Sequence, residues 1–141
     1  MKVRFIEVRE AKGEKITSPE TVIKLMGEEG KADREAFWVL HLNTRNKIIE
    51  KELVSLGIAD SSLVHPREVF KKAILNGAVS IITVHNHPSG DPTPSEEDIE
   101  IWARLEKAGK IIGIEVIDNI IITPKGEYYS QLELEQKGGI K

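Results

Sequence analysis

Two histidines and an aspartate are spaced so that they can meet at one point of a folded chain. Residues 81–84 are short, β-branched and followed by turn-forming residues, which predicts a buried strand. Strand side chains alternate between faces, so His85 and His87 point the same way where this strand ends. A proline-rich loop follows, and Ser95 is a suitable N-cap for a helix with Asp98 in its first turn. Two imidazoles and one carboxylate, with a fourth position left for water, are the arrangement of a catalytic zinc site.

Each of these features also has a plainer interpretation. A His-x-His pair at a strand end is more often a polar surface pair than a pair of metal ligands. Ser95 and Asp98 by themselves form a capping box, which satisfies the free N–H groups at the start of a helix. The prolines of the loop are ordinary turn residues. The order and spacing of all these residues together favour the metal site.

The same residues carry a resemblance to a known family. His-x-His-Pro followed by Ser95 and Asp98 resembles the motif of the JAMM (MPN-plus) metalloproteases, which are zinc-dependent isopeptidases. The longer string over residues 85–95, together with Pro-Arg-Glu-Val-Phe at residues 66–70, is similar to the RadC branch of that group. The resemblance extends in looser form from residue 16 to residue 130. It implies that one Zn²⁺ per chain is bound by three residues, namely His85, His87 and Asp98.

The resemblance also implies two catalytic residues. JAMM proteins place a catalytic glutamate just before an apolar strand, and Glu35 stands at the entrance of the apolar stretch 36–42. From spacing alone, Glu35 is better interpreted as a solvated acid at a strand edge. Glu50 and Glu52 are rival candidates, but their alternation with apolar residues predicts that they face solvent, so Glu35 ranks above both. Ser95 matches the JAMM serine that stabilises an oxyanion, so capping and catalysis are competing or shared duties of one hydroxyl.

Composition narrows the possible chemistry. The chain has 141 residues, which is the length of a single domain, here a RadC-like JAMM/MPN domain over residues 1–141. It has no cysteine, which excludes a disulfide, a thiolate nucleophile and the zinc-deaminase site that needs Pro-Cys-x-x-Cys. Its net charge is −3, whereas a dedicated DNA-binding domain is expected to be basic. No apolar run approaches the length of a membrane span and no signal-type segment follows Met1, so we expect a cytoplasmic protein.

The spacing of apolar residues predicts an α/β fold. Strands are expected at residues 3–8, 36–42, 47–56, 81–84, 111–117 and 119–123. Helices are expected to start at Pro19, at Pro66 and after Ser95, the last ending at residues 108–109. The strand–helix–strand unit over residues 47–84 predicts that the central strands pair partly in parallel. We also expect an N-terminal strand extension over residues 1–15 and a frayed tail over residues 131–141.

The expected architecture is a mixed, curved sheet flanked by about three helices. This arrangement is like that of the JAMM/MPN domain, which itself resembles the cytidine deaminase architecture. In that family the second residue of an Asp-His pair occupies the position that is Asn119 in this chain, after Asp118. The role of that residue is therefore open here, whereas the expected zinc ligands are unaffected.

The remaining polar residues near the motif have more modest expected roles. His41 has no ligand partner in the sequence and is expected to be structural. His65 precedes a proline at a helix start, so we expect it to satisfy local polar groups, with a place in a substrate groove as the alternative. Three further residues are expected to shape the loop or to support the metal ligands, namely Asn86, Ser89 and Asp91.

Three functions are compatible with the sequence. The leading hypothesis is a zinc metallopeptidase of the RadC/JAMM type, acting on a peptide or isopeptide substrate that the sequence does not identify. The RadC name implies an alternative, a DNA repair or recombination accessory protein, but we expect no helix-hairpin-helix segment here and the acidic charge does not support nucleic-acid binding. The third is a metal-binding interaction module without turnover. Neither the oligomeric state nor direct DNA binding can be read from the sequence.

Overall fold

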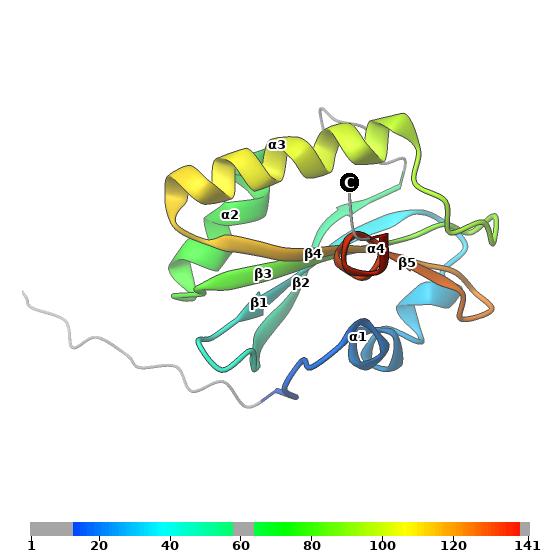
Figure 1. The fold of residues 1–141 in the computed structure, drawn as a ribbon, viewed down its shortest axis with the longest axis horizontal. Helices are drawn as coiled ribbons and strands as arrows, with labels where there is room; N and C mark the ends of the chain where they lie inside the picture. The colour runs from blue at the N-terminus through cyan, green and yellow to red at the C-terminus, as the bar shows by residue number, and fades with distance from the viewer. Residues whose placement is uncertain (1–12, 58–63, 139–141) are drawn as a thin grey trace, which may run out of the picture.

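The central strand of the sheet is β3 (Ser80–Asn86), and all 7 of its residues are buried. The computed structural model describes residues 13–57 and 64–138. Within them, a five-stranded sheet has the order β2-β1-β3-β4-β5 (Figure 1). Burial on both faces explains why β3 is not an alternation of apolar and polar residues. The other elements are α1 (Pro19–Leu25), the 3₁₀ helix η1 (Glu29–Lys31), β1 (Ala36–Leu42), β2 (Ile48–Leu56), α2 (Pro66–Leu75), α3 (Glu96–Ile112), β4 (Glu115–Ile122), β5 (Tyr128–Ser130) and α4 (Gln131–Gly138).

The predicted α/β class with a mixed sheet is confirmed, but the parallel pair lies elsewhere than the sequence predicts. Strand β1 pairs antiparallel with β2 on one side and with β3 on the other. Strand β3 pairs in parallel with β4, and β4 pairs antiparallel with β5. The helix α2 therefore connects β2 to β3 across the intervening β1, while α3 connects the parallel pair. The order of elements along the chain does not reveal this, because long-range packing decides which strands are neighbours.

Helices cover both faces of the sheet (Figure 1). Helices α2 and α3 lie over one face, where Phe37, Val39 and Trp102 belong to one buried cluster. On the opposite face α1 lies over a second cluster that includes Leu40 and Leu42. The side chains of β1 therefore alternate between the two faces, and the strand expected at residues 36–42 is confirmed.

Helix α3 is longer than the sequence predicts. The predicted end at residues 108–109 is wrong, because α3 continues to Ile112 and ends at Gly113, which has a φ of 90°. Gly109 instead permits close packing, since a Cβ atom there would lie 2.5 Å from the carbonyl oxygen of Ile114. The two strands expected after this helix are correspondingly one continuous strand, β4.

The predictions for the two ends of the chain have different outcomes. The tail expected to fray from residue 131 forms α4 instead, which packs against β4 and β5 and is the fourth α-helix of the described residues. Lys15 and Lys47 form an isolated antiparallel bridge, whereas the strand expected at residues 3–8 lies outside the described residues. In the described part of the chain, no helix combines the length and apolar character that crossing a membrane requires.

Asp118 and Asn119 explain why α4 forms. The Asp118 carboxylate accepts from the Leu132 N–H at 2.9 Å and from the Ser130 hydroxyl at 2.6 Å. The Asn119 amide donates to Gln131 Oε1 at 2.9 Å. Together these bonds hold the first turn of the helix, whose backbone N–H groups have no partner within the helix itself. The position that departs from the family pattern thus has a structural role in this chain.

A buried polar network ties β1 and β2 to the end of α2. The Asn76 amide donates to His41 Nδ1 at 2.9 Å, so the proton of the neutral ring lies on Nε2 and is donated to Glu52 Oε1 at 3.0 Å. Asn76 also donates to Glu50, whose other oxygen lies 2.6 Å from Lys72 Nζ. His41 is structural, as predicted. The expectation that Glu50 and Glu52 face solvent is wrong, because both are half-buried in this network.

Candidate metal centre

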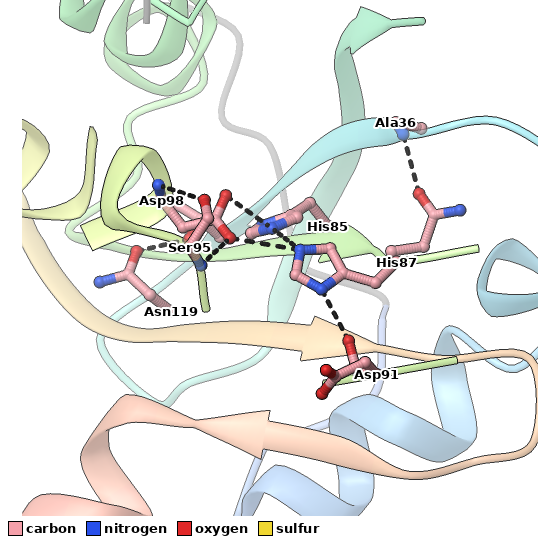
Figure 2. A network of polar contacts seen from close by, with 9 residues as sticks. Ala36, His85, His87, Asp91, Ser95, Asp98 and Asn119 are labelled. Carbon is pink, nitrogen blue, oxygen red and sulfur yellow. Dashed lines mark hydrogen bonds and ion pairs between the residues drawn. The ribbon is translucent and has the colours of Figure 1, made fainter. Parts of the chain in front are cut away.

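His85, His87 and Asp98 meet where β3 ends and α3 begins (Figure 2). The Nε2 atoms of the two histidines are 3.1 Å apart. Asp98 Oδ1 lies 3.2 Å from His85 Nε2, and Asp98 Oδ2 lies 3.2 Å from His87 Nε2. Across residues 13–57 and 64–138, this is the one group of three or more possible ligand side chains whose ligand atoms all lie within 4.8 Å of one another. The structure therefore brings together the three residues that their spacing predicts to converge.

The two imidazoles are oriented in different ways. The His85 ring is buried, stacked on Phe37 with 6.0 Å between ring centroids and tilted against Trp102. No described residue bonds to His85 Nδ1, so packing orients this ring. His87 Nδ1 lies 2.8 Å from the backbone carbonyl of Asp91, to which it donates (Figure 2). In the neutral ring the His87 proton therefore lies on Nδ1 and the Nε2 lone pair is free for a metal, whereas in the protonated ring Nε2 donates to Asp98.

The carboxylate is fixed by the start of α3. The Ser95 N–H donates to Asp98 Oδ2 at 2.8 Å, and the Asp98 N–H donates to Ser95 Oγ at 3.0 Å, which completes a capping box. In this box the Ser95 hydroxyl acts only as an acceptor. A hydroxyl has one donor proton in addition to its lone pairs, so the Ser95 O–H stays available for another partner. Capping and donation are thus compatible duties of one hydroxyl.

The three side chains are electrostatically coupled. Burial by itself would raise the pKa of Asp98, but hydrogen bonds from His85 and His87 outweigh it and hold that pKa well below its usual range. The hydrogen bond to Asp98 raises the pKa of His87; burial opposes this, and the Asp91 carbonyl and the charge of Glu35 reinforce it. The carboxylate is therefore ionised and attracts a cation to the point between the imidazoles.

The spacing of the closest ligand atoms is near that around one tetrahedral ion. Bonds of about 2.0 Å at the tetrahedral angle separate neighbouring ligand atoms by about 3.3 Å. The observed separations are 3.1 Å between the two nitrogens, 3.2 Å from His85 Nε2 to Asp98 Oδ1 and 3.2 Å from His87 Nε2 to Asp98 Oδ2, so each imidazole faces a different oxygen of the carboxylate. Two imidazole lone pairs so close repel one another unless a proton or a metal cation lies between them. Nitrogen and oxygen donors suit Zn²⁺, and three protein ligands leave one position open.

A cleft of about 360 Å³ opens beside this cluster, and Glu35 lines it together with His87, Asp98 and Ser95. The lining residues are Glu35, His87, Pro88, Ser89, Ser95, Glu97 and Asp98. Neither Glu50 nor Glu52 is among them, so of the three acids that the sequence offers, Glu35 is the one beside the cluster. A larger cavity of about 500 Å³ lies between α1 and α4, but no histidine is among its lining residues.

Asn86 turns to the other face of β3 and holds the chain on both sides of Glu35. The Ala36 N–H donates to Asn86 Oδ1 at 2.8 Å, a bond drawn in Figure 2. Asn86 Nδ2 donates to the Arg34 carbonyl at 3.0 Å and lies 3.5 Å from the carbonyl of Ala32. The sequence predicts a local supporting role for Asn86. In the structure, however, Asn86 bonds to Ala36, which lies 50 positions upstream.

Glu97 lines the cleft but carries no signal in the sequence. It belongs to the acidic first turn of α3 with Glu96 and Asp98, where three acids complement the positive end of the helix dipole. That arrangement accounts for its residue type without any further role. Glu97 and Glu96 differ only in where the helix turns them: Glu97 lines the cleft and Glu96 does not.

Other polar residues near the site hold local backbone, as the sequence predicts. The Asp91 N–H donates to Ser89 Oγ at 3.3 Å, and the Thr93 N–H donates to Asp91 Oδ1 at 3.0 Å. His65 Nδ1 accepts from the Arg67 N–H at 3.0 Å and so caps α2. These bonds shape the loop between β3 and α3 and the start of α2.

Comparison with known proteins identifies the family of the chain. A family model described as "RadC-like JAB domain" matches residues 16–137. A UPF0758 protein of Caldanaerobacter subterraneus subsp. tengcongensis is 57% identical over 108 residues, which cover 76% of this chain and 46% of the relative. A UPF0758 protein of Bacillus cereus strain G9842 is 50% identical over 126 residues, which cover 89% of this chain and 54% of the relative. The chain therefore spans about half the length of the curated relatives it matches, and it belongs to the RadC-like JAB domain family.

Proposed function

We propose that this domain is a zinc-dependent peptidase or isopeptidase of the RadC/JAMM type. The observation that carries the proposal is the cleft that Glu35 lines beside three side chains whose ligand atoms all lie within 4.8 Å of one another. His85, His87 and Asp98 would hold the metal. When bound, Zn²⁺ would polarise a water molecule and lower its pKa towards about 7. The resemblance to the JAMM metalloproteases supports the same assignment.

Glu35 is the general base of this proposal. Its carboxylate takes the proton of the attacking water and then passes that proton to the leaving amine, so one residue serves both halves of the hydrolysis. In support of this role, Glu35 lines the same cleft as His87 and Asp98, and its negative charge contributes to the raised pKa of His87. Its backbone is fixed by Asn86 on either side and by the Gly57 N–H, which donates to the Glu35 carbonyl at 2.7 Å.

Ser95 is the oxyanion donor of this proposal. Attack on an amide carbonyl puts negative charge on the former carbonyl oxygen, and a donor aimed at that oxygen is worth roughly 3 kcal/mol in comparable sites. The Ser95 O–H is left free by the capping box, and Ser95 lines the same cleft as Glu35. The base and the donor therefore come from the two segments that flank the ligand cluster.

The test measures metal content first and hydrolysis second. We expect the purified protein to bind one Zn²⁺ per chain and its zinc form to cleave members of a peptide library. Glu35→Gln keeps the zinc but loses at least about 10²-fold in rate, because general acid–base catalysis typically contributes that much. Glu96→Gln is the control, since Glu96 is an exposed acid at the start of α3 that is not among the lining residues of the cleft.

The contrary outcomes separate the alternatives. If Glu35→Gln hydrolyses the same peptide at the parental rate, Glu35 is not the base. A wild-type protein that binds zinc and cleaves no peptide would be a metal-binding interaction module. Retention on DNA that falls steeply with salt would support the repair-accessory role, which the net charge of −3 does not favour.

A further inference from the structure

Asn86 occupies an unusual position between the two histidines of the metal centre. Its side chain is fully buried and lies on the opposite face of β3 from His85 and His87. A buried carboxamide needs partners for its carbonyl and for its NH₂ group, and here both sets of partners are backbone groups next to Glu35. One side chain is therefore bonded to the residue before the proposed base and to the residue after it.

The bonds of Asn86 extend the pairing of β1 with β3 by one position. The backbone ladder between these strands reaches the pair Phe37–His85. Beyond it, the Ala36 N–H is taken by the Asn86 side chain, and Nδ2 of the same amide holds the Arg34 carbonyl. Neither a carboxylate nor an aliphatic side chain can both accept from Ala36 and donate to Arg34 at neutral pH. The carboxamide is thus the group that suits this place.

We propose that Asn86 is a positioning residue, which holds Glu35 at a fixed place relative to the metal ligands. The inference rests on the proposed function, because it assigns Asn86 to the base of that reaction. A proton is transferred over a heavy-atom distance of about 2.6–3.2 Å, and a misplacement of about 1 Å can cost roughly 10²-fold in rate. Since β3 carries His85 and the clamp, and His87 follows it directly, two of the proposed ligands and the proposed base share one rigid support.

The experiment compares two buried asparagines. Asn86→Ala removes the clamp, and Asn119→Ala removes a fully buried amide on the neighbouring strand that bonds to Thr83 and Gln131 instead. Asn86→Asp is the second variant at the clamp, because it keeps the shape and the acceptor for Ala36 but loses the donor to Arg34. The substrate is the peptide that the wild-type zinc form cleaves fastest.

Three readouts are expected to separate positioning from stability. All variants retain one zinc per chain. In the metal-free protein, hydrogen exchange at the Ala36 amide is at least about tenfold faster in Asn86→Ala than in Asn119→Ala. In the zinc form, kcat of both Asn86 variants falls by about 10-fold to about 100-fold while KM stays within about twofold, and Asn119→Ala keeps the wild-type kcat.

Each contrary result has a distinct meaning. Unchanged kcat in Asn86→Ala, with an active wild type, overturns the positioning role and leaves the proposed function standing. Ala36 exchange that is equally fast in Asn86→Ala and Asn119→Ala overturns the clamp, since the effect is then a general loss of stability. A wild-type zinc form that cleaves no peptide overturns the proposed function, and the positioning role with it.

Discussion

The Ser95 hydroxyl caps α3 and is also the proposed oxyanion donor, and mutation can separate these two roles. Glycine is almost as good an N-cap as serine, whereas alanine costs about 1 kcal/mol at this position. We expect Ser95→Gly to lower kcat by about 10²-fold, because one oxyanion donor is lost, while the free energy of unfolding changes by less than about 0.5 kcal/mol. Peptide hydrolysis and urea unfolding of Ser95→Gly and Ser95→Ala check this. A wild-type kcat in Ser95→Gly would contradict the donor role.

Of the two histidines proposed as ligands, His87 can be removed with less damage to the core, because its side chain is 13% exposed and His85 is more deeply buried. We expect His87→Ala to weaken zinc binding by more than about 100-fold, since two ligands from the protein are left. Competition with a chromogenic chelator measures the affinity. His65→Ala is the control, because that histidine caps α2 and should leave zinc binding unchanged. Equal affinities in the two variants would show that His87 is no ligand.

The ligands and the residues around them differ in how far the sequence predicts them. His85, His87 and Asp98 follow from local rules, because strand alternation and helix capping decide where these side chains point. Glu35 follows from the resemblance alone, since an acid before a strand is usually solvated. The long-range bonds of Asn86 depend on which strand lies beside β3, and no local pattern contains that information.

At the scale of an element, the end of α3 also depends on packing that no local sequence pattern contains. The sequence predicts that the helix ends at Gly109, whereas in the structure Gly109 is packed against Ile114 and the helix ends at Gly113. The unit formed by β3, its loop and α3 is otherwise predicted well, because turn and capping residues mark it locally. The β2–β1–β3 order is not predicted from the sequence, because β1 lies between the two strands that helix α2 connects.

Two substitutions test this assignment of the glycines. Gly109→Ala should lower the free energy of unfolding by about 2 kcal/mol, because the new Cβ would lie 2.5 Å from a backbone oxygen that is not free to move. Gly113→Ala should cost about 1 kcal/mol, because alanine is strained at a φ of 90° although the space is open. Gly27→Ala is the control and should be near neutral, with its nearest neighbour at 3.6 Å. Urea unfolding measures all three; a neutral Gly109→Ala would contradict the close packing.

At the scale of the whole molecule, the network around His41 makes stability depend on pH. Burial lowers the pKa of His41 from 6.5 to about 4, with Lys72 adding to the effect and Glu50 opposing it. The unfolded chain therefore binds more protons than the folded chain between these two values, so acid favours unfolding. The stabilising contribution is fully present above the unfolded pKa and is lost as the pH falls towards the folded one.

We expect the free energy of unfolding of the metal-free protein to fall between about pH 6.5 and about pH 4, with up to about 3 kcal/mol of the loss due to His41. His41→Gln is less stable at neutral pH, because the bond to Glu52 is disturbed, but it lacks this titration. The difference between the two proteins in urea unfolding should therefore shrink as the pH is lowered. A difference that stays constant across this range would show that the ring is not held neutral by burial.

The three proposed ligands belong to one short continuous piece of chain, whereas the proposed base directly precedes β1 and reaches them through the pairing of β1 with β3. Metal content would therefore report on the β3–α3 connection and on the packing of Phe37 against His85, but not on the position of Glu35. A variant that displaces Glu35 while β1 stays paired with β3 would keep the metal and lose the proposed base. Assays of this family should therefore measure hydrolysis and metal content separately, because one bound metal per chain does not show that the centre is active.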